Sequence, residues 1–382
     1  MFFDFGPKSG TLLIFFSQGI VFSFLLLKKG IQNQNSSSKW LSLFVFLCSL
    51  YIAPFMLGYA NWYQGGIKRE TLFFVPFQQL FLLGPVLYFY TQSLLDASFR
   101  LQKRDWIHFT PAILYLLYSL VVFVTDKLVL SEYCFYADGR DKDFSLWYQI
   151  AGLVSMLFYL LLSLRYYVYY KKVAFETVSY AESVLFRWLN HFFIAFLIIL
   201  VLRVLFFILN PEWGQFGRKF WYYLCFSALY YYIAISGFSN TVRATIPLSD
   251  SKSNLNEADK QKSKDNSLPD LDSWKTKLEK LMLSEKPYMD SSLTLSDIAR
   301  QLNTRPKTIS KIVNQGFEMN FNDFVNHYRV NAIIEQLKSG QQNTKTLLGI
   351  ALDCGFNSKA TFNRAFKKHT SKSPKEYLVN IS

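Results

Sequence analysis

The chain has 382 residues, and its composition is that of a membrane protein rather than of an ordinary soluble one, with 51% hydrophobic and 18% aromatic residues. The formal net charge of +14 favours an anionic partner, either nucleic acid or anionic lipid headgroups. Four cysteines stand singly and without metal-ligand spacing, so neither a disulfide framework nor a zinc site is expected.

Seven apolar stretches are long enough to cross a membrane, since a span of about 30 Å takes about 20 residues. They lie at about 11–27, 40–59, 71–92, 107–124, 146–170, 189–210 and 220–238. Prolines in or at the ends of these spans are expected to kink helices, at positions 54, 76, 85 and 111. The first stretch ends in Lys28-Lys29 rather than in a cleavage site, which favours a retained helix. The sequence therefore predicts a seven-helix transmembrane bundle in residues 1–238.

The loops between the spans suggest an orientation. With seven spans and a cytoplasmic C-terminus, the cytoplasmic loops at 28–39, 93–106 and 171–188 hold nine Lys and Arg. The opposite loops at 60–70, 125–145 and 211–220 hold seven, which agrees with the positive-inside preference. The acidic and aromatic loop at 125–145 is a candidate ligand or partner surface, or else an ordinary solvated loop.

Two polar positions inside the spans are candidate sensing residues, Arg203 and Gln78. Arg203 lies in IAFLIILVLRVLFFILN, and no span holds an acidic residue to pair with it. We slightly favour a second interpretation, in which its side chain extends to the headgroups near Asn210. Gln78 is expected to face the bundle interior, where ordinary interhelical hydrogen bonds would explain it equally well.

Residues 239–270 form a predicted flexible linker. Aromatic residues vanish there, and SDSKSNLNEADKQKSKDNSLPD is polar, charged and without apolar periodicity. Globular patterning resumes at Leu271, which predicts a soluble helical domain over residues 271–382.

That domain contains an internal duplication. DIARQLNTRPKTISKIV (297–313) aligns with GIALDCGFNSKATFNRAF (349–366), one extra residue falling in the second turn. Each copy predicts a short helix with a small Ala, a turn and a second helix, which is a helix-turn-helix. The two units cover about 294–315 and 345–368, and a long helix at about 320–338 joins them. Its length of about 27 Å is close to the ~34 Å between successive major-groove faces of DNA.

The second helix of each copy has one apolar and one polar face at 100° per residue. Phe362 and Phe366 face the core in the later copy, as do Ile309 and Val313 in the earlier one. The opposite arcs carry basic and amide side chains, which reach base edges and phosphates. Such an arc is often only a solvated face, but its recurrence in two matched motifs favours DNA contact. The predicted contacts are Lys307, Ser310 and Lys311, with Asn314 beside them, and Lys359, Asn363, Arg364, Lys367 and Lys368.

Residues 271–379 resemble the DNA-binding domain of AraC-family transcription regulators, which has two helix-turn-helix units joined by a long helix. IALDCGFNSKATFNRAFKKHTSKSPKEYL carries the likeness most closely. The motif core comprises Ala299, Ile309, Ala351, Gly355, Phe356, Phe362, Phe366 and Pro374. The chain departs from the family at Ser371, where glycine is common, and at Leu378, where a basic residue is frequent. LLGPVLYFYTQSLL and RDWIHFTPAILYLLY are similar to the multi-span region fused to such domains in some bacterial regulators.

The resemblance implies a membrane-tethered, sequence-specific transcription regulator of the bacterial inner membrane, with its C-terminal domain in the cytoplasm. Its expected partners are double-stranded DNA in adjacent major grooves, membrane lipid, RNA polymerase and an unidentified signal ligand or membrane partner. Activation is the usual outcome in the family, and repression stays open. Signal transfer through a homodimer of bundles and proteolytic release of the tail are both open.

Two other classes of protein are less favoured. A receptor or transporter with a lipid- or protein-binding basic tail would carry its cations directly after the last span, whereas here they lie in folded motifs far beyond it. An enzyme is not expected, because the spans hold no nucleophile–base pair, metal cluster or phosphate loop. No cofactor or metal is expected either.

Overall fold

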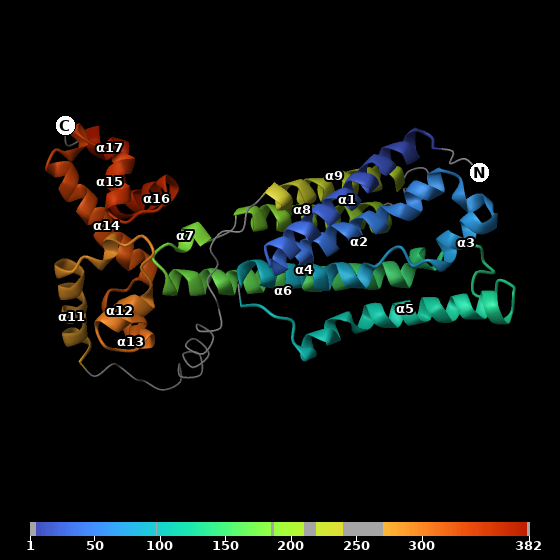
Figure 1. The fold of residues 1–382 in the computed structure, drawn as a ribbon, viewed down its shortest axis with the longest axis horizontal. Coiled ribbons are helices and arrows are strands. Elements are labelled where there is room, and N and C mark those ends of the chain that lie inside the picture. Colours follow the sequence, from blue (N-terminus) through green and yellow to red (C-terminus); the bar gives the residue numbers. More distant parts are fainter. Residues whose placement is uncertain (1–4, 97, 185–186, 210–218, 240–269, 380–382) are drawn as a thin grey trace. The chain divides into compact units, whose positions relative to one another are not determined.

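The structure is a computed structural model and describes residues 5–96, 98–184, 187–209, 219–239 and 270–379. Within these ranges the secondary structure is helical, with no strand and one isolated β-bridge between Val178 and Thr294. The all-α prediction is therefore confirmed for the described residues. The chain forms two compact units: residues 1–167 with 187–242, and residues 168–186 with 243–382 (Figure 1). Most of the predicted linker, residues 240–269, lies outside the described residues.

Unit 1 is a bundle in which α2 (Ser36–Tyr59) packs against α1 (Pro7–Gln32), α4 (Leu80–Leu95) and α9 (Lys219–Ser239). Asn35 begins α2 by accepting a hydrogen bond from the Ser37 amide at 2.9 Å, which satisfies a donor that the helix leaves unpaired. The other α-helices with residues in this unit are α3 (Gly66–Phe74), α5 (Thr110–Phe123), α6 (Leu146–Thr177) and α8 (Arg187–Val204). Shorter helical segments are η1 (Trp62–Gln64), η2 (Lys103–Phe109), η3 (Val124–Val129), η4 (Lys142–Phe144) and η5 (Leu205–Leu209).

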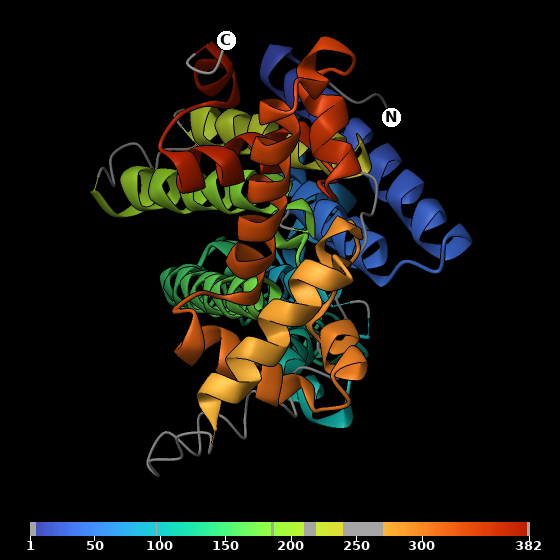
Figure 2. The ribbon, with the colours of Figure 1, turned by 90° about the vertical axis from the view of Figure 1, so that its left-hand side faces the viewer.

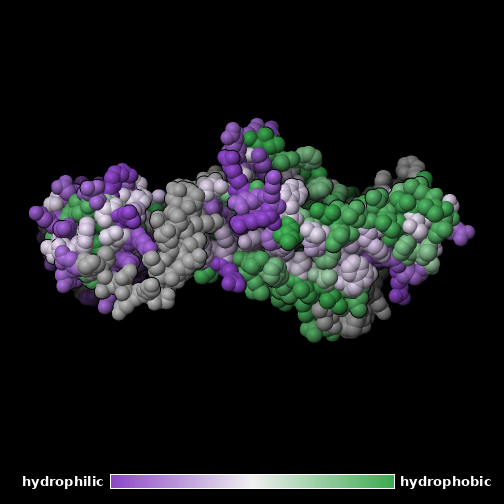
Figure 3. Space-filling model, turned by 90° about the horizontal axis from the view of Figure 1, so that it is seen from below, coloured by the Kyte–Doolittle hydropathy of each residue, from purple (hydrophilic) through white to green (hydrophobic). Residues whose placement is uncertain are grey.

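Five helical segments among the described residues are long and apolar enough to cross a membrane. They are Pro7–Gln32, Ser36–Tyr59, Lys103–Val129, Leu146–Thr177 and Trp188–Phe207. Their outward faces carry large apolar side chains, including Phe24 (68% exposed), Leu114 (61%) and Leu161 (61%). Hydrophobic residues cover much of the visible surface of unit 1 in Figure 3. Patches of this extent are unusual on soluble proteins.

The span predicted at 71–92 is wrong in its first part, because the helix is broken there. α3 ends at Phe74, and α4, with 16 residues, begins only at Leu80. Val75 is extended (φ −91°, ψ 114°), which is the conformation that a following proline favours. Pro76 itself has no amide hydrogen to continue a helix. The amide of Gln78 instead donates to the Asp143 carboxylate at 2.9 Å.

The favoured interpretation of Arg203 was also wrong, since its side chain is only 3% exposed and lies inside the bundle. The guanidinium donates to the carbonyl oxygen of Gln149 at 3.1 Å and to its Oε1 at 2.7 Å. Gln149 Nε2 in turn donates to Oε1 of the fully buried Gln78 at 2.9 Å. The two candidate sensing residues are thus joined through Gln149, and neutral amide oxygens replace the missing acidic partner.

Unit 2 is built around α14 (Phe321–Lys338). In Figures 1 and 2, α14 lies between the pair α12 (Leu295–Gln301) and α13 (Pro306–Lys311) and the pair α15 (Leu347–Asp353) and α16 (Lys359–Thr370). One apolar core runs through all of these helices. The remaining elements are α7 (Ala181–Val184), α11 (Leu271–Ser284), α17 (Pro374–Val379), η7 (Pro287–Met289), η8 (Ile312–Gly316) and η9 (Gln341–Asn343).

Side-chain caps fix where the helices of unit 2 begin. Thr294 and Asp297 form a capping box at the start of α12, with the Asp297 amide 3.3 Å from Thr294 Oγ1. Asn320, Thr346 and Ser358 accept hydrogen bonds from the first turns of α14, α15 and α16. Both helix-turn-helix segments are therefore delimited by local sequence.

Ser371 ends α16 in the left-handed conformation, with φ 60° and ψ 3°. This is the position where the related family commonly has glycine. We expect Ser371→Gly to increase the free energy of unfolding of unit 2 by about 1 kcal/mol, because glycine adopts this conformation without the steric cost. Hydrogen exchange of α16 amides in the full chain would measure it. Ser339→Gly is the matched control, since Ser339 ends α14 at φ −81° and gains nothing from glycine. An equal gain in both variants would contradict the explanation.

Candidate nucleic-acid interface

Unit 2 contains two helix-turn-helix segments, α12–α13 and α15–α16. In each, a buried alanine lies in the first helix, Ala299 (1% exposed) or Ala351 (0%). The second helices of the two segments, α13 and α16, are called the recognition helices. Ile309 of α13 and Val313 of the following η8 are buried in the core, as are Phe362 and Phe366 of α16. The motif core is buried throughout: Ala299, Ile309, Ala351, Gly355, Phe356, Phe362, Phe366 and Pro374.

The opposite faces of the two recognition helices carry the residues predicted to contact DNA. On α16 the side chains that lie exposed are Lys359, Asn363, Arg364, Lys367 and Lys368. On α13 the predicted contacts are Lys307, Ser310 and Lys311, and their side chains are half-buried. By helical spacing, Arg364, Lys367 and Lys368 lie across α16 from Phe362 and Phe366, with Asn363 beside them and Lys359 at the edge of the arc, and the three residues of α13 lie across the helix from Ile309. Such a face can present cations and amides to base edges and phosphates without disturbing the core.

Gly355 lies in the turn between α15 and α16, where its φ of +92° suits glycine. A Cβ atom at this position would lie 2.3 Å from the carbonyl oxygen of Tyr288 and 2.9 Å from Nε of Arg329. Nε of Arg329 donates to that same carbonyl oxygen at 2.7 Å. The turn thus needs glycine both for its backbone conformation and for the close approach of η7 and α14.

A buried polar face of α14 was missed at the sequence level. Asn322, Asn326 and Arg329 are 1%, 6% and 1% exposed, and their spacing of four and three residues places them on one side of the helix. Arg329 donates to the carbonyl oxygens of Tyr288 and Asp290, both at 2.7 Å, and burial lowers the pKa of its guanidinium to about 10. The helical spacing of these polar residues within an apolar pattern was the signal that could have revealed them.

Three predicted DNA-contacting side chains already have partners inside unit 2. Arg364 pairs with Glu182 at 2.7 Å, and Lys368 pairs with Asp323 of α14 at 2.6 Å. Asn314 donates to the Glu176 carboxylate at 3.1 Å. Glu176 and Glu182 belong to the 168–186 segment of the same unit and were not among the predicted site residues.

The charged clusters of the described residues include no group of three or more His, Cys, Asp or Glu that could hold a metal ion.

Comparison with known proteins places this interface in a domain family. Residues 298–380 match the family described as "Helix-turn-helix domain". The chain is 41% identical over 54 residues to the probable transcription factor PqrA of Proteus vulgaris, which covers 14% of this chain and 44% of that protein. It is 30% identical over 96 residues to the uncharacterized HTH-type transcriptional regulator YijO of Escherichia coli, covering 24% of this chain and 33% of that one. No solved structure matches the chain.

Both alignments span less than half of the relatives. Transcription regulators are a non-enzymatic class, so the matched part of the chain is not an enzyme. The C-terminal part of this chain is a helix-turn-helix domain, related to those of bacterial transcription regulators.

Proposed function

We propose that the chain is a membrane-tethered, sequence-specific DNA-binding regulator of AraC type, which couples a signal at the membrane to gene expression. The observation that carries this proposal is the pair of helix-turn-helix segments, each with a buried apolar face and a basic outer face, in a domain that matches the helix-turn-helix family.

The two recognition helices bind in two adjacent major grooves. Asn363, Arg364 and Lys367 on α16 contact base edges and phosphates in one major groove, and Lys307, Ser310 and Lys311 on α13 do so in the next. Lys368 and Lys372 neutralise phosphates, and Lys359 lies at the edge of the DNA-contacting arc. The 18 residues of α14 give a helix of about 27 Å, which suits adjacent major grooves about 34 Å apart.

The N-terminal unit is the tether and sensor. To the five segments long and apolar enough to span a membrane we add α4 and α9, which completes a seven-helix bundle with its C-terminal domain in the cytoplasm. The apolar outward faces of α1, α5 and α6 support lipid contact. We retain the domain boundaries predicted from the sequence, with the membrane domain at 1–238, the linker at 239–270 and the DNA-binding domain at 271–382. RNA polymerase and a second copy of the chain are the further partners that we propose.

Cell fractionation tests the tether. We expect an antibody against residues 271–382 to detect only full-length chain, resistant to alkaline extraction, in the membrane fraction, while DNA cross-links to it in intact cells. A chain that begins at residue 271 serves as the soluble control. A short soluble fragment that appears on induction would reject permanent tethering in favour of proteolytic release.

A further inference from the structure

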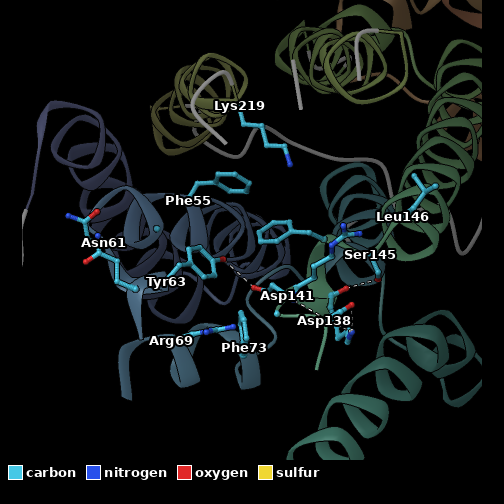
Figure 4. Close-up of a pocket in the computed structure, with 16 residues that line it drawn as sticks. Phe55, Asn61, Tyr63, Arg69, Phe73, Asp138, Asp141, Ser145, Leu146 and Lys219 are labelled. Atoms are coloured by element: carbon cyan, nitrogen blue, oxygen red, sulfur yellow. Dashed lines mark hydrogen bonds and ion pairs between the residues drawn. The ribbon is translucent and has the colours of Figure 1, made fainter. Parts of the chain in front are cut away.

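An open cavity of about 900 Å³ lies in unit 1, where the end of α2, α3, residues 138–146 and the start of α9 meet (Figure 4). Cavities of about 300–1,000 Å³ are typical of small-molecule sites. The chain segments around it include parts of all three loops predicted on the non-cytoplasmic side, at 60–70, 125–145 and 211–220. In the predicted orientation, a cavity in this position can take a ligand from the non-cytoplasmic side of the membrane.

The cavity is lined by more cations than acids. Arg69, Arg140, Lys142 and Lys219 line it, against Asp138 and Asp141. Lys142 pairs with Asp138 at 3.2 Å. The other three cations form no ion pair with a carboxylate in the described part of the chain.

Aromatic rings lie beside two of the three cations that lack an acidic partner, Lys219 and Arg69. The Lys219 ammonium lies 5.9 Å from the ring centres of Phe55 and Phe144, and Figure 4 shows it directed toward Phe55. The guanidinium of Arg69 lies 4.8 Å from the ring centre of Phe73. Cation–π contacts stabilise a charge only partly, so these groups can still gain from an anion.

Asp141 cancels little of this positive charge. It is buried, accepts a hydrogen bond from the Tyr63 hydroxyl at 3.3 Å and lies beside the buried Asp143. Burial and the neighbouring Asp143 raise the pKa of Asp141 well above its usual range, and burial raises that of Asp143 to about 6.

We propose that this cavity binds a small organic anion with an aromatic or apolar portion. Its carboxylate or phosphate group pairs with Lys219, the cation that lies beside Phe55 and Phe144, since charge-assisted hydrogen bonds are the strong ones. Its apolar portion packs on the rings of Phe55 and Phe144.

The cavity wall is joined to the two candidate sensing residues by a chain of hydrogen bonds. Asp141 accepts from the amide of Asp143 at 3.0 Å, and Asp143 accepts from the amide of Gln78 at 2.9 Å. The hydrogen bonds continue from Gln78 to Gln149 of α6 and from Gln149 to Arg203 of α8. A ligand in this cavity therefore lies beside Asp141, the first member of a hydrogen-bond network that extends into the bundle.

Binding to the purified full chain in phosphatidylcholine nanodiscs tests the proposal, and it needs no DNA. The probes are 4-phenylbutyrate and phenyl phosphate, each beside a neutral isostere, 4-phenylbutanamide and benzyl alcohol, observed by saturation-transfer NMR. We expect at least one anion to bind at least tenfold more tightly than its isostere. Lys219→Met should weaken binding of the anion at least tenfold, whereas Lys219→Arg should bind it as the natural chain does. Lys103→Met, at an exposed cation that does not line the cavity, should leave the affinity for the anion unchanged.

Three results would overturn the proposal. They are the absence of binding by either anion, equal binding of anion and isostere, and unchanged affinity in Lys219→Met. Because Lys219→Arg keeps the charge, a loss in Lys219→Met with recovery in Lys219→Arg separates charge recognition from misfolding.

A second inference rests on different contacts, all within unit 2. Ser179 is fully buried against the helix-turn-helix domain. Its amide donates to the carbonyl oxygen of Leu293 at 3.1 Å, and its carbonyl oxygen accepts from Asn322 at 2.8 Å and Arg329 at 3.3 Å. The segment around Ser179 is thus anchored on the buried polar face of α14.

On either side of this anchor, the same segment presents a carboxylate to each recognition helix. Glu182 pairs with Arg364 of α16, and Glu176 accepts from Asn314 of η8, the segment that directly follows α13. These carboxylates occupy the outer faces that phosphates and base edges would need.

We infer that residues 176–182 compete with DNA for the recognition helices and hold the domain in a DNA-free state. This inference rests on the proposed function. Release of the segment would then be the step that permits DNA binding.

The test compares affinities for a DNA site selected from a random pool by the full chain. Glu176→Gln combined with Glu182→Gln should bind that site about tenfold more tightly than the natural chain, because both competing charges are lost. Glu285→Gln, at the exposed residue that directly follows α11, is the control and should leave the affinity for DNA unchanged. Unchanged or weaker binding in the double variant would overturn the inference. If no variant selects a site, the proposed function itself fails.

Discussion

Gly355→Ala is expected to lower the free energy of unfolding of unit 2 by about 3 kcal/mol or more. Two costs add: a left-handed backbone at φ +92° for a residue with a Cβ, at about 1–2 kcal/mol, and overpacking, at about 1–3 kcal/mol. The new methyl group would meet the carbonyl oxygen of Tyr288 at 2.3 Å and Nε of Arg329 at 2.9 Å. Backbone cannot move aside cheaply, and the Arg329–Tyr288 hydrogen bond would be lost as well.

Hydrogen exchange of α14 and α16 amides in the full chain measures this loss. Gly316→Ala is the matched control, because its Cβ would meet only ordinary contacts at 3.8 Å and beyond, and its φ lies outside the left-handed range. It should change the free energy of unfolding by less than about 1 kcal/mol. Equal protection in the Gly355→Ala variant and the natural chain would contradict the assigned turn.

Arg364→Ala is expected to weaken binding to a preferred DNA site by about 1–3 kcal/mol, and binding to random DNA by less. The guanidinium is exposed on the outer face of α16, where it can form paired hydrogen bonds with a guanine edge. Arg364 also forms an ion pair with Glu182, so Glu182 competes with DNA for its guanidinium. This competition affects every DNA sequence equally, and the ratio of the affinity for the preferred site to that for random DNA therefore still measures base recognition.

Lys368→Ala is the contrasting variant. Lys368 pairs with Asp323 of α14 and is expected to neutralise phosphate only, so its loss should weaken all sequences similarly. Titrations of full-length protein in nanodiscs with labelled selected and random duplexes measure both variants. Equal losses on the two duplexes for Arg364→Ala would reject its role in reading bases.

Local patterns in the sequence predicted the two helix-turn-helix segments of unit 2 well, but they assigned residues 168–186 to the membrane domain and predicted unit 1 less well. Capping residues such as Thr294 and Ser358 fix the starts of their helices by contacts within four residues. The helix-turn-helix segments could therefore be predicted from the sequence. In unit 1 the apolar run at 71–92 concealed the break at Pro76. Hydropathy cannot predict that the backbone amide of Gln78 donates a hydrogen bond to the Asp143 carboxylate, because the two residues lie far apart in the sequence.

The polar residues that sequence reasoning misplaced depend on tertiary contacts. Arg203 was expected to reach the headgroups because no acidic residue lies in a span, yet the side chain and carbonyl of Gln149 satisfy it inside the bundle. Arg329 gave no sign of burial, since its acceptors are backbone carbonyls of η7 and the following turn. Glu182 could not be linked to Arg364 from a separation of 182 residues.

Hydroxyl-radical footprinting of a selected DNA site by the full chain in nanodiscs tests the central claim most directly. The claim is that one chain presents α13 and α16 to adjacent major grooves. It predicts two protected patches on one face of the duplex, about 10 base pairs apart, with the patch of α16 lost in Arg364→Ala and that of α13 retained. A single patch, or protection that does not depend on sequence, would contradict it.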